Sequence, residues 1–184
     1  MITERLQRWI DTALMASAQR WAFGLAAVVM ATGALLVTLV GTGDRFGWFA
    51  VLTVVLAAIA AVQAGSHTAA VVIVLVVLQW MSAVDDPTTP RSLMVAVCLL
   101  VFHSVLALMA VTPHSTTVPP DVLRRWAQRV GAVTITTAAV WALVRVLQQR
   151  DAPADPRLTL LALLAAGLGV VLLLRRTIGD IDDG

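Results

Sequence analysis

The sequence feature that most constrains the fold is an apolar run from Trp21 to Val40, twenty residues without a charged side chain. At about 1.5 Å per residue, a helix of this length spans about 30 Å, the thickness of the hydrocarbon core of a bilayer. Of the 184 residues, 59% are apolar and 13% are charged, against about 45–50% and about 25% in soluble domains. A soluble chain of this composition would lack the polar surface to cover its core, so the sequence predicts an integral membrane protein.

Further apolar runs predict an all-α, polytopic transmembrane helix bundle of about six spans. The stretch from Trp48 to Val84 is too long for one crossing, and we divide it into two short helices joined by a tight turn at Gly65 and Ser66. The Pro-containing segments on either side of Leu93–Val111 are typical of loops. The predicted spans are residues 21–40, 48–63, 68–84, 93–111, 130–147 and 158–174.

Residues 1–20 predict an N-terminal interfacial amphipathic helix, because Leu6, Trp9 and Ile10 share one face at helical spacing. An ordinary cytoplasmic helix packed on the bundle is an equal alternative. A second amphipathic segment follows Asp121, a predicted N-cap, and carries Arg124 on its polar side. Residues 175–184 form a predicted cytoplasmic acidic tail.

The distribution of arginine predicts the orientation, with both termini in the cytoplasm. If the N-terminus lies inside, eight arginines fall on the inner side and five on the outer side, and both Arg-Arg pairs are inside. The chain has arginine but no Lys, Asn or Tyr, a usage typical of a GC-rich bacterial genome. We therefore expect a multi-pass protein of the bacterial cell (plasma) membrane that contacts the lipid bilayer and binds no nucleic acid.

His103 is the most prominent candidate functional residue, since it lies about 15 Å into the fourth predicted span. An intramembrane ionisable residue is a functional candidate. The alternative is a neutral imidazole that hydrogen-bonds to Gln79 or to a hydroxyl group of Thr134, Thr136 or Thr137. No second His is expected at the same depth, so the sequence predicts no haem and no other cofactor.

Asp85 and Asp86 are adjacent acids at the predicted outer ends of the third and fourth spans. Paired acids can bind a cation or act as acid and base, but they also commonly cap helices and keep loops in water. An enzyme that used these acids together with His103 would need an active site that extends from the outer surface to the membrane centre. The chain has no HExxH, GxSxG or P-loop motif, and we predict no catalytic residue and no metal site.

Two tripeptides in the chain are identical. Ala18-Gln19-Arg20 recurs as Ala127-Gln128-Arg129, in each case before a predicted span. Too few spans follow the second copy for a duplicated domain. We interpret the repeated tripeptide as two uses of the same side-chain chemistry at a membrane surface.

The stretch Leu99–Arg129, with His103, a Pro-rich loop and Leu123-Arg124-Arg125-Trp126, resembles uncharacterised small polytopic membrane proteins of actinobacteria. Some of those are encoded near MoxR-type ATPases, and the resemblance implies an accessory role. The leading hypothesis is a non-catalytic accessory or structural subunit of a cell-envelope membrane complex, with a membrane-protein partner or as a homo-oligomer. The alternative is a small channel or transporter with a polar path around His103.

Overall fold

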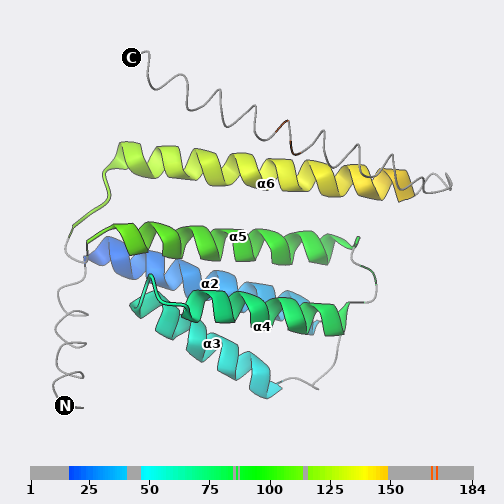
Figure 1. Cartoon of the computed structure of the whole chain (residues 1–184), viewed down its shortest axis with the longest axis horizontal. Coiled ribbons are helices and arrows are strands. Elements are labelled where there is room, and N and C mark those ends of the chain that lie inside the picture. The colour runs from blue at the N-terminus through cyan, green and yellow to red at the C-terminus, as the bar shows by residue number, and fades with distance from the viewer. Residues whose placement is uncertain are drawn as a thin grey trace. The chain divides into compact units, whose positions relative to one another are not determined.

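The computed structural model describes residues 17–40, 47–84, 86, 88–113, 116–148, 167 and 169. These residues form helices and loops, with no strand among them (Figure 1). The predicted N-terminal helix (apart from residues 17–20), the acidic tail and the sixth span (apart from Gly167 and Gly169) lie outside the described residues. The helices are α2 (Ala18–Leu39), α3 (Gly47–Val62), α4 (Thr68–Ala83), α5 (Pro90–Val111) and α6 (Pro120–Gln148).

Three of these helices are long and apolar enough to cross a membrane: α2, α5 and α6 over Pro120–Val146. The all-helical class and the membrane-like character of the chain agree with the sequence prediction. The 16 residues each of α3 and α4 correspond to about 24 Å of helix. Their two crossings, and hence a total of six spans, remain predictions.

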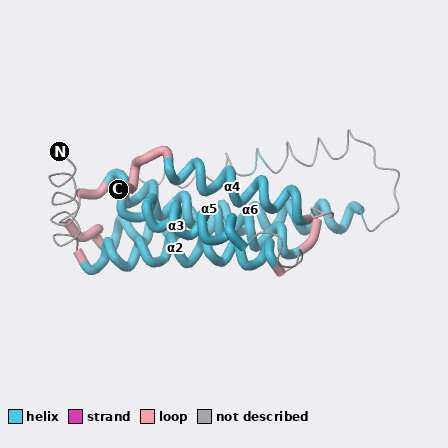
Figure 2. The backbone as a smooth tube through the Cα atoms, turned by 90° about the horizontal axis from the view of Figure 1, so that it is seen from below, coloured by secondary structure: helices cyan, strands magenta, loops and turns pink. Residues whose placement is uncertain are grey.

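Residues 1–127 form one compact unit and residues 128–184 a second. In the first unit, α2 packs along α5 and also contacts α3, while α3 and α4 form a helical hairpin. The described connections lie at the two ends of this bundle (Figure 2). Short connections of this kind make successive helices antiparallel, so the start of α2 meets the end of α5.

The buried sides of α2 and α3 are built largely from small side chains. On α2, Ala27, Ala31 and Ala34 are completely buried, and Ala57 and Ala60 of α3 are buried to 99% or more. Gly24 lies at the junction, because a Cβ atom placed on it would be 3.7 Å from the Cβ of Ala61. Small side chains at recurring positions let helix backbones approach closely, which is the usual way in which helices pack in lipid.

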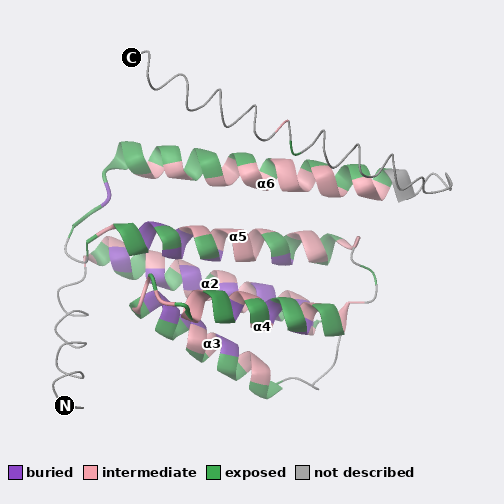
Figure 3. Cartoon of the chain, viewed as in Figure 1, coloured by how far each residue is buried: buried purple, intermediate pink, exposed green. Residues whose placement is uncertain are grey.

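Many large aliphatic residues are exposed instead, and the exposed positions are green in Figure 3. Leu25 and Leu36 of α2 are 66% and 57% exposed. Contiguous apolar surface of this extent is unfavourable in water but not against acyl chains. The many large apolar residues on the outside therefore support a lipid environment for the apolar helices.

The hairpin of α3 and α4 turns at Gly65, as the sequence predicts. Gly65 has φ of 100°, a conformation that side chains with a Cβ atom adopt at a cost. Its Cα–H face lies against α5, since an added Cβ would be 3.6 Å from the Cβ of Ala110. The turn is thus fixed at the same end of the bundle as the end of α5.

The predicted amphipathic segment and fifth span are one continuous helix, α6. The predicted N-cap, Asp121, lies inside its first turn and forms an ion pair of 2.7 Å with Arg125 one turn later. The physical reason is that Pro120 is well suited to the first helical position, which moves the start two residues earlier. Near the other end of α6, the Arg145 guanidinium group lies 5.6 Å from the centre of the Trp141 ring.

Enlarging a small residue in the interior should destabilise the bundle. Leucine in place of Ala31, which is fully buried, inserts three carbon atoms into closed packing and should cost about 1–3 kcal/mol. The expected result for Ala31→Leu is a lower thermal midpoint in detergent, followed by tryptophan fluorescence. Ala22→Leu adds the same atoms on the exposed face of α2 and should leave the midpoint nearly unchanged. Equal effects of the two substitutions would contradict the assignment of the faces.

Candidate functional site

His103 lies on the exposed side of α5, whereas Phe102, Val105 and Leu106 face the core. Within the described residues its imidazole forms no hydrogen bond. The predicted bond to Gln79 is therefore not observed. His103 presents a polar group on the outer face of the four-helix bundle, midway along a helix that is apolar throughout.

Gln79 is buried in α4, with 7% of its surface exposed. Its Nε2 atom has no hydrogen-bond partner within the described residues. A buried polar group without a partner costs about 1–3 kcal/mol. Gln79 is thus a polar side chain inside the bundle, separate from the outward-facing His103.

Asp86 is exposed, and its carboxylate caps the loop before α5. Its Oδ1 atom accepts hydrogen bonds from the backbone N–H of Thr88 at 2.8 Å and from the Thr88 hydroxyl at 2.7 Å. Asp85 lies outside the described residues. Thirteen residues of helix separate Pro90 from His103, or about 20 Å, so Asp86 and His103 do not form one site.

The threonines predicted to face His103 use their hydroxyl groups locally. Thr134, Thr136 and Thr137 each donate to the carbonyl oxygen four residues earlier, at 2.8–2.9 Å. This bond satisfies the hydroxyl group inside its own helix, as lipid requires. In the described part of the chain, no three His, Cys, Asp or Glu side chains lie close enough together to hold a metal ion.

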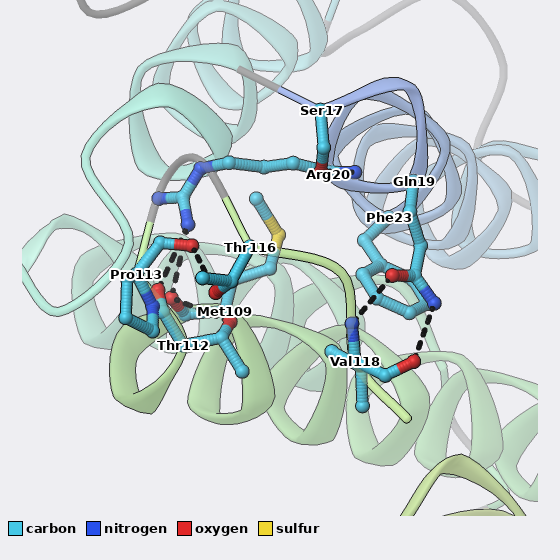
Figure 4. A pocket seen from close by; sticks show the side chains of 9 residues that line it. All are labelled: Ser17, Gln19, Arg20, Phe23, Met109, Thr112, Pro113, Thr116 and Val118. Carbon is cyan, nitrogen blue, oxygen red and sulfur yellow. Dashed lines mark hydrogen bonds between the residues drawn. The ribbon is translucent and has the colours of Figure 1, made fainter. Parts of the chain in front are cut away.

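The structure instead concentrates polar contacts where α2 begins and α5 ends (Figure 4). The side chain of Gln19 forms two bonds with the backbone of Val118: Val118 N–H donates to its Oε1 atom at 2.7 Å, and its Nε2 atom donates to the Val118 carbonyl at 3.4 Å. Arg20 Nη1 donates to the carbonyl oxygens of Met109 and Thr112, at 3.2 and 3.3 Å. We call Gln19, Arg20 and these three partners the α2–α5 clasp.

Arg20 is 8% exposed, and its charge is placed at the carboxyl end of α5. The last carbonyl groups of a helix have no partner within the helix and carry partial negative charge. The guanidinium group supplies both the missing donors and the favourable charge. The clasp therefore closes the end of α5 and attaches the connection to α6 through Val118.

From the sequence, Arg20 is recognisable as one of the arginines that set orientation and as the last residue of a repeated tripeptide. Its true partners lie 89 and 92 residues away in the sequence, and nothing in the local pattern indicates them. Ser17 fits a recognisable signal, because its hydroxyl group accepts from the Arg20 N–H at 3.3 Å as an N-cap.

A small cavity lies beside the clasp, lined by Phe23 and Thr116 together with clasp residues. About 10 Å³ is free inside it for a water-sized sphere, which is close to the space that one water molecule needs. A metabolite does not fit. The chemistry of this region is therefore the fastening of helices, with room for a bridging water.

Trp126 forms a second fastening point. Its Nε1–H group donates to the carbonyl oxygen of Ser104 at 3.3 Å, and its ring packs against the core. The bond joins the second turn of α6 to α5, within the first unit. The amphipathic segment predicted after Asp121 includes Trp126, but the sequence pattern does not identify this partner.

Comparisons of the chain with protein-family models, curated proteins and solved structures found no significant match.

Loss of the Gln19 side chain should loosen the α5–α6 connection. Gln19→Ala removes two hydrogen bonds, worth together about 1–3 kcal/mol. The Val118 amide should consequently exchange its hydrogen faster, measured by mass spectrometry of peptides that cover residues 116–123. Gln19→Glu keeps the acceptor for the Val118 N–H and should have a smaller effect.

Gln128→Ala is the matched control, because Gln128 is exposed in the second copy of the same tripeptide. In Gln128→Ala, the rate of amide hydrogen exchange at Val118 should equal the rate in the unmodified protein. An unchanged rate in Gln19→Ala would show that the connection does not depend on the clasp.

Proposed function

We propose that this chain is a non-catalytic integral membrane protein that serves as an accessory or structural subunit of a cell-envelope membrane complex. The partner is another membrane protein, or a second copy of the chain. The resemblance to small polytopic membrane proteins of actinobacteria, some encoded beside MoxR-type ATPases, adds support to this role.

The observation that carries the proposal is the position of His103. An exposed imidazole at the middle of an apolar helix is unfavourable in lipid unless a polar group meets it. The described residues of α2–α5 offer it no hydrogen bond, and the Gln19, Arg20 and Trp126 side chains are already used to join helices of this chain. A helix of a partner that packs against α5 would supply the missing hydrogen bond and cover the exposed face.

The proposal is tested by affinity purification in mild detergent, with co-purifying proteins quantified by mass spectrometry. A partner should appear in stoichiometric amount with the unmodified protein. His103→Leu keeps the bulk of the side chain but cannot form a hydrogen bond. One interhelical bond contributes about 0.6–2 kcal/mol, so recovery of the partner should fall roughly threefold to thirtyfold.

Met94→Leu is the control, since Met94 is another exposed residue of α5, 55% exposed. It should leave recovery unchanged. Size-exclusion chromatography with light scattering separates a hetero-complex from a homo-oligomer. A protein that is monomeric and free of partners under these conditions would refute the proposal.

A small channel or transporter is the second candidate, and the buried amide of Gln79 favours it. A polar group inside the bundle without a protein partner is a position where water or an ion can bind. In that case Gln79→Leu should abolish a flux into proteoliposomes that the unmodified protein supports. Absence of any flux with the intact protein under varied ion gradients would exclude this function.

A further inference from the structure

The first two turns of α6 carry two adjacent cations on the outside of the first unit. Arg124 and Arg125 are exposed, and we call them the arginine pair. Arg125 is held by Asp121 at 2.7 Å, with its side chain 50% exposed. Arg124 forms no hydrogen bond or ion pair within the described residues. One cation of the pair is thus available, and the other is only partly neutralised.

Trp126 fixes the depth of the arginine pair. It bonds to Ser104, which lies seven residues before the last residue of α5, or about 10 Å from that end. The arginine pair immediately precedes Trp126 in the same helix. The backbone of the arginine pair therefore lies level with the last turns of α5.

The exposed apolar residues at this end place the membrane boundary close by. Val111, the last residue of α5, is 79% exposed, and Trp21 at the start of α2 is 57% exposed. The 22 residues of α2 span about 33 Å, close to the thickness of the hydrocarbon core. A tryptophan at such a boundary commonly lies among the lipid headgroups.

We propose that the arginine pair forms a binding site for the phosphate group of an anionic phospholipid. Arginine side chains near the end of a membrane helix extend their guanidinium groups toward the headgroups, where lipid phosphates are the abundant anions. A guanidinium group matches a phosphate in charge and hydrogen-bond geometry, and two arginines at neighbouring positions of one helix concentrate positive charge at this level. Trp126 acts as the anchor that holds the pair at this level.

The test is native mass spectrometry of the full-length protein in detergent, titrated with phosphatidylglycerol or phosphatidylcholine. Phosphatidylglycerol should bind more tightly, and Arg124→Gln/Arg125→Gln should weaken it about tenfold or more, given the usual contribution of each arginine at an anionic surface. Phosphatidylcholine binding should not change. Arg91→Gln, at an exposed position at the opposite end of α5, should bind both lipids like the unmodified protein.

Asp121→Asn should change phosphatidylglycerol binding in the opposite direction. It releases Arg125 from its carboxylate and should strengthen phosphatidylglycerol binding severalfold, a gain that misfolding cannot produce. Equal binding of the two lipids, or equal loss in Arg91→Gln, would overturn the site. Full competition by inorganic phosphate would also overturn it, because the ligand would then be a soluble anion rather than a lipid.

Discussion

The close approach of α2 to its neighbours depends on the absence of large side chains between them. Ala27, Ala31 and Ala34 of α2 and Ala57 and Ala60 of α3 are all fully or almost fully buried. In a bilayer the exclusion of water does not drive helices together, because lipid tails are as apolar as the side chains. Dispersion contacts between closely spaced backbones must replace that force. The larger residues are then free to face the acyl chains, where their bulk fills space without separating the helices.

A second constraint is that each polar group in such a bundle needs a partner within the protein. The threonine hydroxyl groups meet it inside their own helices, as Thr38 does with the carbonyl oxygens of Ala34 and Leu35. Arg20 and Gln19 meet it across helices, at the end of α5 where free carbonyl groups are available. Gln79 and His103 are the exceptions among the candidate residues. One lies inside the bundle and the other outside, which is why they support different functional hypotheses.

The helical class and most of the described helices are predictable from hydropathy alone. The turn at Gly65 and the division of the long apolar stretch follow from local chemistry, since glycine acts within one or two residues of itself. The start of α5 differs from the prediction, because the helix begins at Pro90, three residues before Leu93, with the proline at the first helical position. The continuity of α6 does not follow in this way. A change from a polar to an apolar surface at about Val130 indicates a boundary in the sequence, but it is no obstacle to a helix that passes from one environment to another.

The two copies of the Ala-Gln-Arg tripeptide show where local information ends. The sequence determines that both copies are helical and that both precede an apolar segment. Only the tertiary structure decides that Gln19 and Arg20 join distant parts of the chain while Gln128 and Arg129 remain exposed. The reason is physical: the role of an amide or guanidinium group depends on which acceptors lie within about 3 Å. The end of α5 and Val118 are brought to the first copy by helix packing, which no local pattern encodes.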